Sequence, residues 1–173
     1  MREAERTGKV TAGLELGPLG TFTLRSVHPV YDGDALVGYV ELGKEIEDVL
    51  ARIHQKDGLE IALTIRKNAL TRSVWEEGML GLGREADWER FPDSVLIYSS
   101  LPRFPVELDH CVVATGYDDS HTSEEATPGG QTWRVMGTPV QDASSAVVGD
   151  LIVLHDTSPE RAAHRRLLTL AAG

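Results

Sequence analysis

The sequence contains a single cysteine and fewer basic than acidic residues, and both shortages restrict what the protein can be. Cys111 alone can form neither a disulfide within the chain nor a zinc site that needs several cysteines. Lysine and arginine number 17 against 27 aspartate and glutamate residues, so the formal net charge at pH 7 is -10. Nucleic acids and anionic lipid surfaces are bound through clustered positive charge. We therefore expect no nucleic-acid partner.

Long apolar runs are also missing, although hydrophobic residues make up an ordinary 41% of the chain. No stretch approaches the ~20 apolar residues of a membrane-spanning helix. The first ten residues, MREAERTGKV, lack the apolar centre of a signal peptide. Any link to a membrane is therefore expected to run through spans that are absent from this sequence.

Catalytic motifs are the third absence. The chain has no phosphate-binding P-loop, no Gly-x-Ser-x-Gly sequence and no HExxH pair among its six histidines. His110 and Cys111 are neighbours, but a nucleophilic cysteine needs a base that is oriented in space, and a buried structural cysteine is the simpler interpretation. We expect no enzymatic activity, no metal and no cofactor.

Periodicity predicts several helices and strands. Apolar residues at 46, 49, 50 and 53 follow helical spacing, which predicts a helix over 43–57 that Gly58 ends. Alternation over 59–67 predicts a strand. The remaining segments are interpreted as a loop or strand start at 13–20, a short helix at 70–83, a loop or single turn at 86–93, a strand at 94–100, a helix in preference to a strand at 105–116, an exposed loop at 117–130, a hairpin of 131–142 with 146–156, and a capped helix over 157–173.

One pattern occurs twice. The segments PVYDGDALVGYVEL (29–42) and PVQDASSAVVGDLIVL (139–154) both begin Pro-Val-x-Asp, reach Val-Gly and end in an apolar strand. Each predicts a β-hairpin, and a predicted helix follows each one, at 43–57 and 158–171. Pro29 cannot donate to a strand ladder, so we expect it at an edge or a bulge. The pattern indicates a repeated hairpin–helix unit, and the alternative is a chance likeness between two hairpins.

Three segments carry a resemblance to a known family. They are GLELGPLGTFTLRSVHPVYDGDALVGYVELGKEIEDVL (13–50), VWEEGMLGLGREADWERFP (74–92) and VVGDLIVLHDTS (147–158). Together they resemble the double Cache sensor domains of bacterial histidine kinases, chemotaxis receptors and diguanylate cyclases. The resemblance implies an α+β fold with two stacked PAS-like lobes, in which helices flank an antiparallel sheet and a ligand cavity lies between them. It also implies an extracytoplasmic (periplasmic) part of an inner-membrane protein, with a final helix that passes the signal inward.

The sequence departs from that pattern at its start, because only 20 residues precede Thr21. A full first lobe needs more strands and helices than these residues can form. We therefore expect 1–58 to be the remnant of a first Cache lobe, with a hairpin at 20–42 and a linking helix. We expect 59–156 to form a complete PAS-like lobe and 157–173 to form an outgoing signalling helix.

Candidate ligand-binding residues come from the expected complete lobe. A cavity-facing arginine could hold a carboxylate through two hydrogen bonds, whereas on the other sheet face Arg134 would be a surface residue. The segment TWRVMG has large side chains on both faces, so alternation leaves both options open. Asp150 could receive an amine or could serve the hairpin. Residues such as Trp75 and Tyr98 are more often core residues than ligand contacts. The full set of candidates is Arg134, Trp75, Tyr98, Trp133, Met136 and Asp150.

The leading hypothesis is an extracytoplasmic small-molecule sensor of a transmembrane signalling protein. Its ligand would be a carboxylate or another anion, and it would form a homodimer through helices such as 43–57. The alternative is a structural module that spaces and dimerises the same kind of receptor without a ligand. An enzyme of unrecognised type is a third hypothesis, for which no residue spacing provides support.

Overall fold

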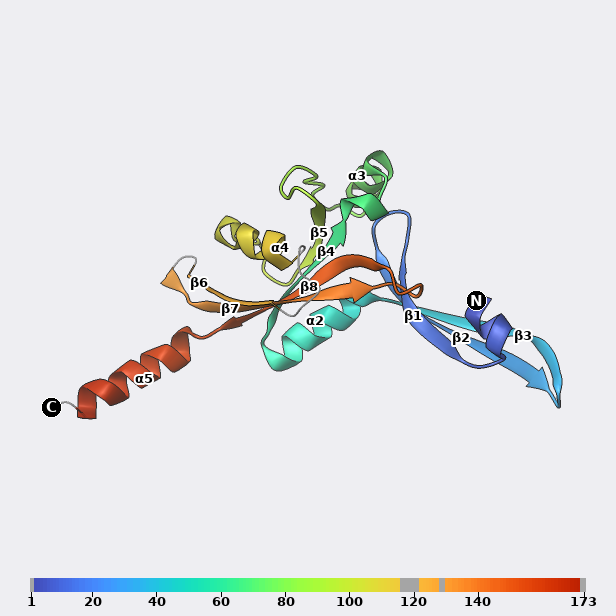
Figure 1. Cartoon of the computed structure of the whole chain (residues 1–173), viewed down its shortest axis with the longest axis horizontal. Helices are drawn as coiled ribbons and strands as arrows, with labels where there is room; N and C mark the ends of the chain where they lie inside the picture. The colour runs from blue at the N-terminus through green and yellow to red at the C-terminus, as the bar shows by residue number, and fades with distance from the viewer. Residues whose placement is uncertain (1, 116–121, 128–129, 172–173) are drawn as a thin grey trace.

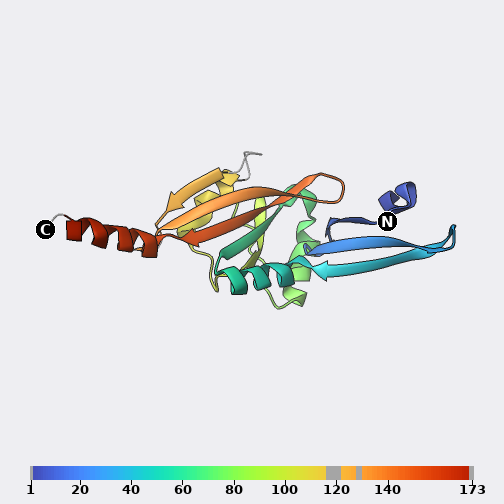
Figure 2. The same ribbon diagram turned by 90° about the horizontal axis from the view of Figure 1, so that it is seen from below.

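Two antiparallel sheets and five α-helices make up an elongated molecule in the computed structural model, which describes residues 2–115, 122–127 and 130–171 (Figure 1). The helix α5 projects from one end and the hairpin of β2 and β3 from the other (Figure 2). The elements in chain order are α1 (Arg2–Thr7), β1 (Thr11–Leu16), β2 (Phe22–Asp32), β3 (Ala35–Glu45), α2 (Ile46–Asp57), β4 (Glu60–Arg66), the 3-10 turn η1 (Lys67–Ala69), α3 (Arg72–Gly81), β5 (Ser94–Ser99), η2 (Val106–Leu108), α4 (Asp109–Thr115), β6 (Thr122–Ala126), β7 (Trp133–Gln141), β8 (Val147–Asp156) and α5 (Ser158–Ala171).

The first sheet has the strand order β1-β2-β3. The segment 13–20, predicted as a loop or a strand start, contains the end of β1, which pairs with β2. The predicted hairpin at 20–42 is confirmed as β2 and β3. Strand β3 continues to Glu45, so α2 starts at Ile46 instead of 43. The helix then ends as predicted, because Gly58 has a left-handed conformation with φ of 66° and donates its N–H to His54 O.

The second sheet has the strand order β5-β4-β8-β7-β6, and every neighbouring pair is antiparallel. Its first and last strands in the chain, β4 and β8, are therefore neighbours near the middle of the sheet. Helix α4 packs on one face against Trp133 and Ile152, while Leu50 of α2 packs on the other with Ile61. This is the predicted α+β architecture, a PAS-like antiparallel sheet flanked by helices.

The prediction of an exposed loop over 117–130 is wrong for Thr122–Ala126, because this segment forms the edge strand β6. The residues are polar and have no apolar alternation, so they give no local strand signal. They become a strand because β7 pairs with them, with Glu125 opposite Arg134. The rest of that prediction, at 116–121 and 128–129, lies outside the described residues.

The repeated sequence pattern encodes the same bulged hairpin twice. In β2–β3 the register shifts after Val30, so Val30 pairs with Gly38 and Val37 is left as the extra residue. In β7–β8 the register shifts after Val140, so Val140 pairs with Gly149 and Val148 is the extra residue. The Pro-Val and Val-Gly pairs therefore mark the two sides of each bulge. Pro29 lies beside the first bulge, as predicted, and a helix follows each hairpin.

The two sheets share a hydrophobic cluster. Phe22 of the first sheet packs in it with Leu50 of α2, Trp75 of α3 and Leu63 of β4. Gly20 allows the chain just before Phe22 to lie against Trp75, because a Cβ at its position would lie 2.3 Å from Trp75 Cδ1. A second cluster lies between α4 and the second sheet. Within the ranges that the structure describes, no helix combines the length and the apolar character needed to cross a membrane.

Candidate functional site

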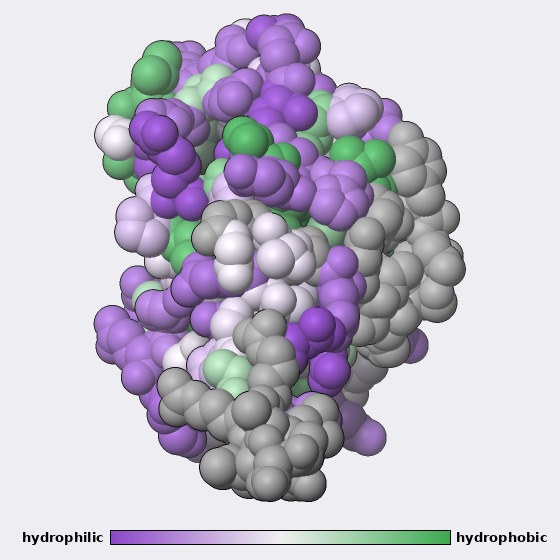
Figure 3. All heavy atoms as spheres, turned by 90° about the vertical axis from the view of Figure 1, so that its left-hand side faces the viewer, coloured by the Kyte–Doolittle hydropathy of each residue, from purple (hydrophilic) through white to green (hydrophobic). Residues whose placement is uncertain are grey.

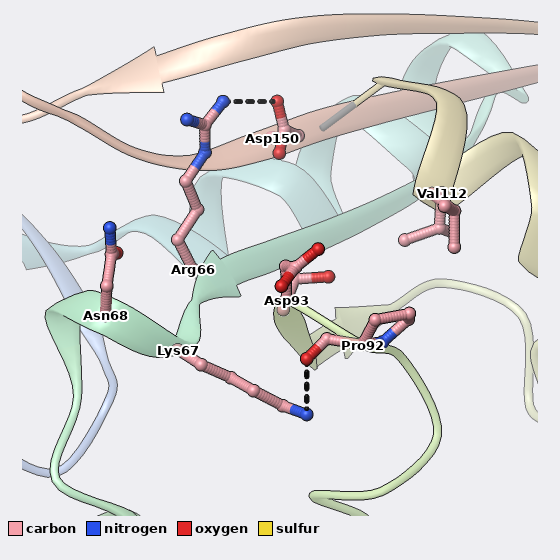
Figure 4. Close-up of a pocket in the computed structure, with 9 residues that line it drawn as sticks. Arg66, Lys67, Asn68, Pro92, Asp93, Val112 and Asp150 are labelled. Carbon is pink, nitrogen blue, oxygen red and sulfur yellow. Dashed lines mark hydrogen bonds and ion pairs between the residues drawn. The ribbon is translucent and has the colours of Figure 1, made fainter. Parts of the chain in front are cut away.

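A pocket of about 400 Å³ lies on the face of the second sheet that α4 covers. Its size is within the range of small-molecule binding sites. Figure 4 shows that the end of β4, the first half of β8, the loop before β5 and the helix α4 surround it. The lining residues are Arg66, Lys67, Asn68, Pro92, Asp93, Ser94, Val112, Val113 and Asp150.

The strand register explains why polar groups gather here. Along β4, the side chains of Ala62, Thr64 and Arg66 share one face, because side chains two residues apart point the same way. Thr64 is opposite Asp150 of β8, and Arg66 is opposite Ser94 of β5. The same face is apolar around Ala62 and polar around Arg66, so the pocket forms where the apolar core ends.

Asp150 is a buried carboxylate at the edge of this pocket, with 2% of its surface exposed. The preceding Gly149 lets β8 approach β4 closely, since a Cβ there would lie 2.0 Å from Thr64 O. Arg66 Nη2 is 3.9 Å from Asp150 Oδ1, which is an ion pair but longer than a hydrogen bond (Figure 4). A ligand atom that enters the pocket could therefore interact with both groups.

Lys67 holds one side of the pocket in place. Its ammonium donates to Phe91 O at 2.6 Å and to Pro92 O at 2.9 Å. It also lies 5.2 Å from the ring centroid of Trp88, a cation–π distance. Lys67 therefore fixes the loop that leads into Asp93, and its ammonium also contacts the ring of Trp88.

The pocket combines the cations of Arg66 and Lys67 with carboxylates and an apolar wall. The guanidinium of Arg66 can bind a carboxylate or phosphate, and the carboxylates of Asp93 and Asp150 can accept from an amine. Val112 and Val113 of α4 add apolar surface. This arrangement suits a small molecule that carries charges of both signs.

The structure brings only one of the six candidates from the sequence, Asp150, into the pocket. Trp75 is fully buried in the cluster that joins the sheets, and Trp133 is a core residue with 7% exposure. Tyr98 packs on the other side of the sheet. Burial raises the pKa of its phenol above 10.0, and the nearby carboxylates of Glu47 and Glu60 raise it further.

Arg134 and Met136 are exposed on the sheet face opposite the pocket. Trp133 and Val135 occupy the core face of β7, so strand alternation turns the residues between them outward. Arg134 lines a separate hollow beside the start of α5, with His155 and Glu160. Figure 3 views the molecule from the end where α5 projects, and the described residues visible there are mostly hydrophilic. Binding roles for these residues stay predictions.

Arg66, Lys67 and Asp93 were not among the sequence candidates. A signal for Arg66 was present, because the alternation of Ile61, Leu63 and Ile65 places it on the other face of β4. Asp93 lies in an irregular loop, and no local pattern marks it. No group of three or more acidic, histidine or cysteine side chains within the described ranges could hold a metal ion.

A comparison with protein families places residues 1–85 in a match to the family model dCache_3, described as the double sensory domain of two-component sensor kinase. The match runs from α1 through α3 and includes Arg66, Lys67 and Asn68 of the pocket. Asp93, the α4 residues and Asp150 lie beyond it. No curated protein matches the chain.

Proposed function

We propose that this chain senses a small molecule in the pocket beside Asp150, because its residues 1–85 match the model of the double sensory domain of two-component sensor kinases. Sensing is the general role of that family. The ligand, the site and the route of the signal are the proposal. We also propose, from the family, that the domain works outside the inner membrane as part of a receptor.

The observation that carries the proposal is the pairing of opposite charges inside one pocket. Arg66 and Asp150 face each other at 3.9 Å, and Asp150 is almost fully buried. Burying a charge is costly unless partners compensate it. A ligand with an anionic group and an amine would complement the guanidinium of Arg66 and the carboxylate of Asp150, so we favour a small zwitterion over a simple anion.

The route to the helix follows from the chain itself. Strand β8 carries Asp150 into the pocket and ends at Asp156, and α5 starts two residues later. Thr157 donates its backbone N–H and its hydroxyl to Thr132 O, which holds this junction against the start of β7. A ligand that shifts β8 would therefore alter the position of α5 relative to the sheet.

The test is a thermal-shift screen with amino acids, simple amines and simple carboxylic acids. A ligand that binds only the folded state stabilises it by ~2.7 kcal/mol at a hundred times its dissociation constant. We expect a zwitterion to raise the melting temperature of the wild type. The shift should be lost in both Arg66→Gln and Asp150→Asn, each compared with its own ligand-free protein.

Arg134→Gln is the matched control, because this arginine is exposed on the opposite face. It should keep the full ligand shift. A shift that disappears only in Arg134→Gln would move the site to the hollow beside α5. A ligand whose thermal shift is lost in Arg66→Gln but kept in Asp150→Asn would be a simple anion. A folded protein that responds to none of the three classes would favour the structural module without a ligand.

A further inference from the structure

Two walls of the pocket come from segments outside the sheet. One wall is formed by Pro92 and Asp93, in the loop before β5, and the other by Val112 and Val113 of α4. Figure 4 shows Asp93 and Val112 on these two walls. Residues 82–93, all within the described ranges, form neither a helix nor a strand, and α4 has only seven residues. A helix of that length is not stable by itself, so both walls depend on tertiary contacts for their positions.

Arg90 connects the two walls. Its Nη2 donates to Asp109 Oδ1 at 2.7 Å, and its Nε donates to Asp109 Oδ1 and Oδ2 at 3.1 and 3.2 Å. Asp109 is the first residue of α4, and Arg90 lies two residues before Pro92. A forked contact of this kind fixes the orientation of the carboxylate as well as its distance. The pair therefore fixes the start of α4 relative to the loop that carries Pro92.

The guanidinium of Arg90 is itself held in place. Its Nη2 also donates to Phe104 O at 2.9 Å. Its Cζ lies 5.2 Å from the ring centroid of Phe91 and 5.4 Å from that of Phe104, which are cation–π distances. Both rings are buried in the same cluster as Cys111 and Val112 of α4. Arg90 thus lies where the loop, the segment around Phe104 and α4 meet.

We propose that Arg90 is a positioning residue of the pocket, which acts through Asp109 and keeps α4 closed over the sheet. When the pair is broken, α4 opens as a local unit while the sheet stays folded. The pocket then loses its apolar wall, so a ligand binds more weakly. This last step rests on the proposed function, whereas the opening of α4 does not.

The natural cysteine measures the opening without any ligand. Cys111 is the only cysteine of the chain, and 2% of its surface is exposed, so iodoacetamide reaches it only when α4 or the whole protein opens. When reclosing is faster than alkylation, the alkylation rate follows the open population. Arg90→Gln should raise this rate at least about tenfold. Urea unfolding of the same variant gives the share of that increase that global unfolding explains, and we expect it to be the smaller share.

Arg84→Gln is the matched control, because Arg84 also forms a two-point ion pair, with Glu47 of α2. Helix α2 packs on the sheet face opposite α4. The loss of this pair should therefore raise the alkylation rate of Cys111 only as far as the lower global stability explains. A rise in Arg90→Gln that global stability also explains in full would overturn the proposal.

Asp109→Asn tests the pair from its other side. It should raise the alkylation rate as well, and the double variant with Arg90→Gln should react no faster than Arg90→Gln alone, because both changes remove the same contact. Increases that multiply in the double variant would overturn the proposal. Circular dichroism checks folding, and Asp109→Asn, which keeps an acceptor oxygen, carries the test if Arg90→Gln does not fold. A ligand screen without a hit would contradict the proposed sensing but would not change these rates, so the two failures are distinguishable.

Discussion

Two arginines with similar sequence surroundings end up in different roles. Arg66 and Arg134 both lie in strands beside apolar residues. Arg66 faces the pocket and Asp150, whereas Arg134 faces solvent on the other side of the same sheet. Alternation indicates which residues of one strand share a face. It does not indicate which face a helix will cover, and that choice decides which arginine can meet a ligand.

Asp142 illustrates a residue whose role is local. Its Oδ1 accepts hydrogen bonds from Ser144 N at 2.8 Å, from Ser144 Oγ at 2.6 Å and from Ala146 N at 3.1 Å, at the turn between β7 and β8. The bonds from the hydroxyl and the two amides hold the pKa of the carboxyl below 3.8. The stabilisation is therefore complete above the unfolded pKa and disappears as pH falls through the lowered folded pKa.

Asp142→Ala should lower the melting temperature at neutral pH, and the difference from the wild type should shrink as the pH falls below the ordinary carboxyl pKa of 3.8 and through the lowered folded pKa. Thermal unfolding followed by circular dichroism at several pH values measures this. Asp142→Asn keeps an acceptor oxygen without the charge, so its melting temperature at neutral pH should lie between those of the wild type and Asp142→Ala. A difference that stays constant down to the acid limit would contradict the assignment.

At the scale of elements, the contact between the loop before β2 and α3 depends on one glycine. Gly20 has φ of 79°, and a Cβ there would lie 2.3 Å from Trp75 Cδ1 and 3.0 Å from its Nε1. The tryptophan is fully buried, so it has no free space to move into.

Gly20→Ala should therefore destabilise the protein by about 3 kcal/mol, from backbone strain and steric overlap together. Urea unfolding measures the change. Gly33→Ala is the matched control, because Gly33 has φ of 60° but a Cβ there would meet nothing within 4 Å. It should cost only about 1 kcal/mol of backbone strain. Equal losses in the two variants would show that the contact with Trp75 is unimportant.

At the scale of the whole molecule, the sheets are joined by more than the linking helix. The cluster around Trp75 contains residues of both sheets, and Ala143 N at the tip of the β7–β8 hairpin donates to Leu14 O of β1 at 2.8 Å. Arg84, after α3, forms a two-point ion pair with Glu47 of α2. The division of the chain at residue 58 into a partial and a complete lobe stays a prediction.

We expect both sheets to unfold in one transition, because the shared cluster cannot persist when either side is lost. Circular dichroism reports on both sheets. Tryptophan fluorescence reports on Trp75 and Trp88 at their junction, where the rings are 5.5 Å apart, and on Trp133 in the core of the second sheet. The two signals should give coincident curves in urea. Two separate transitions would show that the sheets are independent folding units.

The sequence by itself determined the α+β class, the repeated hairpin–helix unit and the helix boundaries to within a few residues. These features depend on local periodicity, turn residues and caps, which contact neighbours a few positions away. The tertiary structure alone decided that 122–126 is a strand, which sheet face carries the pocket, and that Arg66 meets Asp150. Those outcomes depend on pairing and packing between segments far apart in the chain, and the local sequence around a residue does not specify its distant partner.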